Sequence, residues 1–128
     1  MSDRPGGEHR LITPDTVKWG PAPPALPPGA EAAILAGDPA KPGQAFALRV
    51  RFADGYVIPP HWHPVDEHVV VLQGTLTMGL GEKADTASMQ AMTAGSFGLM
   101  PKGKRHYARA KGRTIIQVNG MGPSRSTT

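Results

Sequence analysis

Glycine and proline constrain the fold of this chain more than any other feature of its sequence. The 128 residues include 16 glycines and 14 prolines, and both residue types disfavour the interior of a long helix. Between them lie short runs rich in apolar and β-branched residues, a pattern typical of all-β proteins with many turns. The length suits one domain with a real core but not two independent ones. We therefore expect a single all-β domain.

Two stretches carry the strand pattern most clearly. Residues 45–52 place an apolar side chain at every second position, with alanine or arginine between them, as in a strand with one buried face. The β-branched run 68–72 ends at Gln73-Gly74, and residues 75–80 alternate again, which predicts a hairpin turning at Gly74. Further turns are expected at 81–85 and 101–104, and further strands at 12–19, 97–100, 106–110 and 114–119. About eight short strands in all predict a sandwich or a barrel.

The two ends of the chain are expected to lie outside this β domain. Residues 1–10 look disordered, and the prolines of 21–29 favour an extended, polyproline-like segment without ladder hydrogen bonds. We therefore divide the chain into a disordered and proline-rich arm at 1–29, a single barrel domain at 30–122 and a flexible tail at 123–128. Such an arm can lie across the sheet or across a neighbouring subunit.

Composition limits both the chemistry and the compartment. The chain has no cysteine, so disulfides and thiolate ligands are excluded, and a metal would need nitrogen and oxygen ligands. No apolar run is long enough to span a bilayer. The N-terminal stretch MSDRPGGEHR lacks the apolar segment of a secretory signal. These observations predict a cytoplasmic protein with no membrane partner.

A formal net charge of +4 raises the question of nucleic-acid binding. The one dense cluster of positive charge surrounds an expected hairpin and comprises Lys102, Lys104, Arg105, Arg109, Lys111 and Arg113. No basic helical face accompanies this cluster, so a nucleic-acid partner is not expected. The cluster is either a solvated hairpin or a patch that steers an anionic substrate.

Three of the five histidines lie in the stretch HWHPVDEH at 61–68. On an extended chain His61, His63 and Glu67 share one side, whereas His68 points to the other side and suits a structural or interface role. Imidazole nitrogen and carboxylate oxygen are good ligands for divalent transition metals. The pattern predicts a metal site at the mouth of a closed sheet, with room for a fourth ligand.

The remaining histidines are His9, in the arm, and His106, which follows the turn at 101–104. Residues 55–74 fit the pattern G-x5-H-x-H-x3-E-x6-G, and residues 95–106 fit G-x5-P-x-G-x2-H. In both motifs the chain resembles the cupin superfamily. It departs at Ala110, where the second motif ends in asparagine, and this departure leaves the histidines intact.

The resemblance implies a cupin-type β-barrel, a jelly-roll-like fold with a metal inside. It also implies that the metal ligands are His61, His63, Glu67 and His106, with Glu67 either ligating the ion or acting as the catalytic proton acceptor. The ion would be one divalent transition metal, namely Fe, Mn, Ni, Cu, Co or Zn, with Fe(II) favoured.

The expected lining of the barrel is apolar, which bears on the substrate. It comprises Phe46, Leu48, Val50, Phe52, Leu76 and Met78, with either Ile116 and Val118 or Ile115 and Gln117. An apolar pocket whose one strong chemical group is a metal favours a small, largely uncharged or enolisable organic substrate. We therefore expect a metal-dependent enzyme, in the first place a dioxygenase and in the second a lyase or isomerase.

Two expectations concern binding rather than catalysis. The alternative to an enzyme is a non-catalytic cupin that binds a metal and senses a small ligand, because fold alone does not determine function. The outward side chains of 68–72, together with the proline-rich arm, suit a homodimer.

Overall fold

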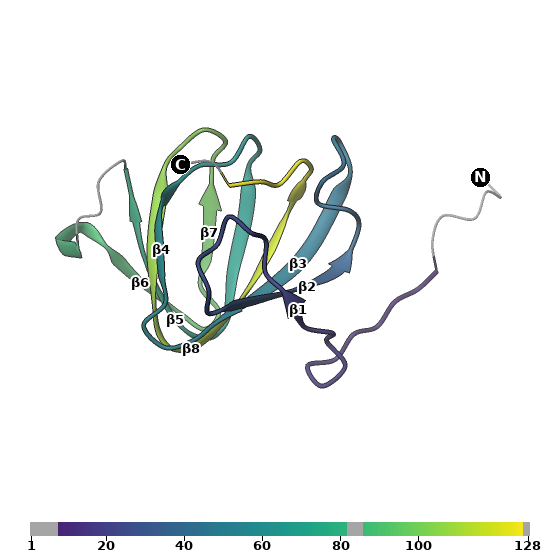
Figure 1. Ribbon diagram of the computed structural model, residues 1–128, viewed down its shortest axis with the longest axis horizontal. Coiled ribbons are helices and arrows are strands. Elements are labelled where there is room, and N and C mark those ends of the chain that lie inside the picture. Colours follow the sequence, from purple (N-terminus) through teal and green to yellow (C-terminus); the bar gives the residue numbers. More distant parts are fainter. Residues whose placement is uncertain (1–7, 82–85, 127–128) are drawn as a thin grey trace.

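Strands joined by tight turns make up almost all of the structure. The computed structural model describes residues 8–81 and 86–126 (Figure 1). The strands are β1 (Gly20–Pro21), β2 (Ala30–Ala36), β3 (Ala45–Phe52), β4 (Val57–His61), β5 (Glu67–Leu80), β6 (Gln90–Thr93), β7 (Phe97–Met100) and β8 (His106–Met121). The described residues contain one short 3-10 helix, η1 at Thr86–Ser88, and no helix that is long and apolar enough to cross a membrane. The expected all-β class is confirmed.

Two long strands, β5 and β8, form the centre of a barrel. They run antiparallel beside each other, with a register that extends from Glu67↔Gly120 to Leu80↔His106. The first half of β5 also pairs with β7 and its second half with β6. In the same way β8 pairs with β4 through its first half and with β3 through its second. The two long strands therefore contribute to both walls around one interior (Figure 1).

Each long strand contains a glycine with positive φ close to the shift in their mutual register, namely Gly74 in β5 and Gly112 in β8. Gly74 in β5 has a φ of 75°, and a Cβ on it would lie 2.4 Å from the carbonyl oxygen of Arg113 in β8. The expected hairpin at Gly74 is wrong, because β5 continues through this glycine. Residues 106–110 and 114–119 likewise belong to the single strand β8, so the basic cluster surrounds no hairpin. A positive-φ glycine suits a bulge as well as a turn, and the local sequence does not distinguish them.

The interior of the barrel is apolar, as the alternation of the strands predicted. The buried core comprises Phe46, Val50, Phe52, Tyr56, Ile58, Val69, Val71, Leu76, Met78, Met100, Ala108, Ala110, Ile116 and Val118. On β8, Ile116 and Val118 are therefore the inward pair, while Gln117 accepts a hydrogen bond from Arg49 at 3.1 Å. The alternation on β3 is confirmed over its full predicted length, 45–52.

Four strands were not expected: β1, β2, β4 and β6. β1 is only Gly20–Pro21, and the composition of the other three hides them. β2 has the sequence AEAAILA, β4 contains Pro59-Pro60, and β6 is only QAMT. Alanine is depleted in strands, and proline within a run argues against a central strand. The expected number of strands is close to the observed one, although its members differ.

The N-terminal region packs against the barrel in a way that the sequence did not indicate. The N–H of Thr16 bonds to the carbonyl oxygen of Thr13 at 2.9 Å in a turn, and the edge strand expected at 12–19 is wrong. Leu26 closes another turn and packs against the core, while the hydroxyl of Tyr56 donates to the carbonyl oxygen of Pro27 at 2.6 Å. Residues 21–29 therefore contain a turn and pack against the barrel, and they do not form an extended polyproline arm.

Our expectations for residues 1–7, 82–85 and 127–128 lie outside the described residues. The outward face of β5 and β7 is described and is exposed. It carries Leu72, Phe97 and Leu99, with the ring of His68 at 5.5 Å from that of Phe97. The homodimer and the lack of a nucleic-acid partner stay predictions.

Candidate metal centre

Three strand ends bring the predicted site residues to one end of the barrel. His61 is the last residue of β4, Glu67 the first of β5 and His106 the first of β8, while His63 lies in the loop between β4 and β5. His61 and His106 are direct partners in the antiparallel pairing of β4 with β8. All four side chains belong to buried residues, with exposed fractions of 5 to 8%. His9, by contrast, is exposed and far outside this group in the chain.

A hydrogen-bonded loop contact joins the two sequence motifs. The N–H of Gly103 donates to the carbonyl oxygen of His63 at 2.8 Å, and the N–H of Lys102 donates to Oδ1 of Asp66 at 2.8 Å. Gly103 has a φ of 73°, a conformation that glycine adopts without strain. The turn before His106 is thus fixed on the loop that follows His63.

The three imidazoles form one compact group. The ring centre of His61 lies 4.9 Å from that of His63 and 4.2 Å from that of His106, and the third pair is 5.2 Å apart. One nitrogen from each ring can be chosen so that all three lie within 4.8 Å of one another. This is the geometry of three ligands that can converge on a single ion.

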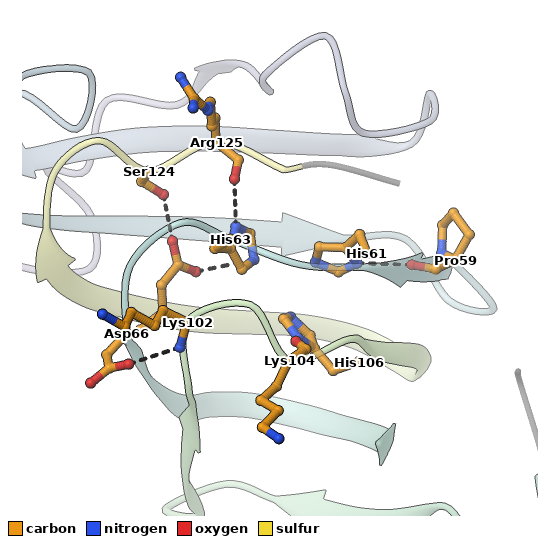
Figure 2. A network of polar contacts seen from close by, with 10 residues as sticks. Pro59, His61, His63, Asp66, Lys102, Lys104, His106, Ser124 and Arg125 are labelled. Atoms are coloured by element: carbon orange, nitrogen blue, oxygen red, sulfur yellow. Dashed lines mark hydrogen bonds and ion pairs between the residues drawn. The ribbon is translucent and has the colours of Figure 1, made fainter. Parts of the chain in front are cut away.

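The other nitrogen of each imidazole faces a backbone carbonyl (Figure 2). Nδ1 of His61 lies 2.8 Å from the oxygen of Pro59, and Nδ1 of His63 lies 2.9 Å from the oxygen of Arg125. Nδ1 of His106 lies 3.3 Å from the oxygen of Lys104. Because a carbonyl only accepts, each Nδ1 carries the proton and each Nε2 keeps its lone pair. Ligating histidines are commonly oriented by such contacts, so the group fits a divalent transition metal.

Burial favours the neutral form of His61 and His106. It lowers the pKa of His61 below its usual value. Burial, together with repulsion from His61, lowers the pKa of His106 to about 4. A neutral imidazole is the form that binds a metal. The site is thus ready to accept a cation at neutral pH without first losing protons from these two rings.

Glu67 lies beside this group rather than fully within it. Its Oε1 is 3.4 Å from Nε2 of His63, and its Oε2 accepts a hydrogen bond from Oγ of Ser124 at 2.5 Å. Two ligands of one tetrahedral ion with bonds of 2.0–2.2 Å lie about 3.4 Å apart. Among the described residues, however, the possible ligand atoms that all lie within 4.8 Å of one another belong to the three histidines and not to Glu67. The roles of Glu67 as ligand and as proton acceptor therefore stay predictions.

A cavity of about 120 Å³ lies between this centre and the apolar core. Its walls include most of the predicted lining, for example Val50, Leu76 and Ile116. The lining residues that the sequence missed include five near the chain ends: Pro23, Leu26, Ser124, Arg125 and Ser126. No motif or periodicity marked them. Ser124 and Arg125 contact Glu67 and His63, and the flexibility expected of the tail at 123–128 stays a prediction.

Known proteins agree with this fold and place the chain in a family. Residues 10–123 match the family described as "Domain of unknown function (DUF4437)". The chain belongs to this family. Germin-like protein 5-1 from Oryza sativa subsp. japonica is 37% identical to this DUF4437 protein over 71 residues, which are 55% of this chain and 32% of the plant protein. The chain thus spans about a third of the length of that relative.

Two solved structures resemble the DUF4437 protein over most of its length. An RmlC-like cupin from Shewanella frigidimarina is 15% identical, with a TM-score of 0.69, and the match covers 92% of this chain and 94% of that one. The polyketide cyclase RemF from Streptomyces resistomycificus is 15% identical, with a TM-score of 0.75, over 94% of this chain and 85% of that one. At such identities the likeness shows the fold alone. The expected cupin-type barrel is confirmed as the fold of this chain.

Proposed function

We propose that this DUF4437 protein is a metal-dependent enzyme that acts on a small organic substrate. The observation that carries the proposal is the set of three buried imidazoles, each with Nδ1 facing a backbone carbonyl, that can offer three nitrogens within 4.8 Å of one another. The proposed ligands are His61, His63 and His106, with Glu67 as a fourth. Of the ions that suit nitrogen and oxygen ligands, Fe(II) is favoured.

The chemistry divides between the ion and the protein. A metal bound here polarises a substrate carbonyl or exchanges electrons with dioxygen. Glu67 is the one carboxylate among the described residues that line the cavity, and we assign it the role of accepting a proton from the substrate. The apolar walls exclude water around it and strengthen its electrostatic interactions. We favour a dioxygenase, with a lyase or isomerase as the second possibility.

The lining of the cavity favours an uncharged, enolisable substrate. Arg125 is the one lysine or arginine among the described lining residues, and its side chain points away from His63 (Figure 2). A substrate with several carboxylates would therefore find no buried cation to pair with. RemF, which shares the fold, is a polyketide cyclase. We take from it one class of compound for the test, namely polyketones and the phenols derived from them.

A non-catalytic, ligand-sensing cupin is the second candidate. The observation that favours it is the single carboxylate in the cavity, because acid and base steps often need two titratable groups. A sensor would bind the same small molecules and release them unchanged.

The experiment begins with metal analysis of protein purified without added ions. Oxygen uptake with β-diketones and phenols would then support a dioxygenase, and anaerobic turnover of the same compounds would support a lyase or isomerase. Thermal stabilisation by these compounds without turnover would favour the sensor. A protein that binds none of the six candidate metals would contradict both functions.

A further inference from the structure

We propose that Ser124 is a positioning residue of the metal centre and acts through Glu67. This inference rests on the proposed metal-dependent function. The hydroxyl of Ser124 donates to Oε2 of Glu67 at 2.5 Å, while Oε1 of the same carboxylate lies 3.4 Å from Nε2 of His63. The serine thus occupies one carboxylate oxygen and leaves the other directed at the imidazole group. We call residues 122–125, which carry this serine, the C-terminal strap.

The position of Ser124 is fixed through its backbone. The N–H of Ser124 donates to the carbonyl oxygen of Pro39 at 2.6 Å, and the N–H of Gly122 donates to that of Gln44 at 2.8 Å. Gly122 is buried, and a Cβ there would lie 2.1 Å from the carbonyl oxygen of Lys41. The C-terminal strap is therefore seated in the loop between β2 and β3. This seating holds the hydroxyl over the cavity independently of Glu67.

The C-terminal strap contacts a second predicted ligand beside the first. The carbonyl oxygen of Arg125 lies 2.9 Å from Nδ1 of His63, and Figure 2 shows that carbonyl facing the ring. Two successive residues of the strap therefore orient two neighbouring groups of the centre. Only Ser124 does so with its side chain, so only its contribution can be removed by a substitution.

Loss of the hydroxyl leaves the buried carboxylate without its donor. Glu67 is 5% exposed, so water does not readily replace the serine, and the carboxylate can rotate away from His63. Removal of such an orienting partner typically weakens metal binding roughly 10- to 100-fold. A residue with a merely structural role would instead lower the stability of the fold and leave the geometry around the ion unchanged.

The test compares Ser124→Ala, Ser124→Thr and the control Ser96→Ala in the full chain. Ser96 is half-buried in the turn before β7 and lies outside the cavity lining. Co(II) affinity is measured by competition with a chromophoric chelator, and the visible spectrum of the Co(II) protein reports the ligand geometry. Urea unfolding of each metal-free variant confirms that it is folded.

We expect Ser124→Ala to weaken Co(II) binding about 10- to 100-fold and to change the visible spectrum. Ser124→Thr keeps the hydroxyl and restores both properties, and Ser96→Ala matches the wild type. An unchanged affinity, or a weaker affinity with an unchanged spectrum, overturns the positioning role and leaves the metal centre standing. A wild-type protein that binds no Co(II) or other candidate metal overturns the proposed function and the positioning role together.

Discussion

The two sides of the metal centre are held in place by different parts of the fold. On the strand side, His61 and His106 are paired neighbours of β4 and β8, and Glu67 begins the long strand β5. On the covering side, Leu26 and Ser124 belong to segments without regular strands near the two ends of the chain. We expect the strand side to supply most of the ligands, and the covering side to supply closure and orientation.

The two sides are expected to differ in the free energy of local opening. A strand in the middle of a sheet is held by a ladder of hydrogen bonds and by a buried face, so it opens only when the whole domain unfolds. Segments held by a few contacts open at lower free energy. We therefore expect the proposed ligands Glu67 and His106, which begin the central strands β5 and β8, to lie on the most stable part of the barrel, and the covering side to open more readily.

The largest effect is expected when a ligand on the strand side is removed. His106→Ala should weaken binding of the metal more than 100-fold, which exceeds the effect typical of an orienting partner. The matched control is His68→Ala on the outward face of β5, which should leave the affinity unchanged. Competition titration with a chelator measures both variants. If the two substitutions had equal effects, the inward and outward faces of the motif would be wrongly assigned.

The strand side was also the part that the sequence predicted best. The inward positions of β3, and the choice of His61, His63 and His106 as neighbours, follow from alternation and from two local motifs. The period of two along a strand fixes which side chains share a face. The spacing of the two motifs indicates which histidines lie together. The error at Gly74 shows the limit, because a positive-φ glycine serves both a hairpin and a bent, continuing strand.

The covering side was missed because its contacts are not encoded locally. Ser124 and Glu67 are 57 positions apart in the chain, and the stretch that contains the serine is as short and polar as many flexible tails. Leu26 lies among prolines that indicate an open arm. Each finds its partner only after the barrel exists, so no periodicity or spacing within the segment could reveal it.

The second largest effect concerns the floor of the cavity. Leu76 is 1% exposed, and Leu76→Ala should lower the free energy of unfolding by about 2–5 kcal/mol through lost burial and the cavity that remains. Urea unfolding of the metal-free protein measures this loss. The conservative variant Leu76→Met should cost less than about 1.5 kcal/mol. Equal losses for the two variants would show that packing at this position does not support the strand side.

The third effect is a pH dependence of the metal-free protein. The pKa of His106 is about 4 in the folded state and roughly 6.5 in an unfolded chain. Between these values the unfolded state binds a proton that the folded state does not, so stability falls as the pH falls from 6.5 towards 4. Between pH 7 and pH 5 the expected loss from this group is about 2 kcal/mol. The lowered pKa of His61 adds a loss of the same sign.

Urea midpoints in the presence of a chelator measure this pH dependence. His106→Gln removes the titrating group and should flatten the profile across the same window, whereas His68→Gln should leave it as in the wild type. A His106→Gln profile as steep as that of the wild type would place the titration elsewhere in the molecule.

The smallest effect on stability is expected on the covering side, at Leu26. This half-buried residue lines both the metal cavity and an adjoining cavity of about 190 Å³ formed with Ile58, Pro59 and Ser126. Leu26→Ala should cost only about 1 kcal/mol of stability, yet it joins the two cavities and opens a path to the ion. Release of the metal to excess chelator should therefore become several-fold faster. The matched control is Leu99→Ala on the outward face, which should leave the release rate unchanged. If Leu26→Ala released the metal no faster than Leu99→Ala, the proline-rich segment would pack against the barrel without controlling access to the ion. The two sides would then differ only in stability.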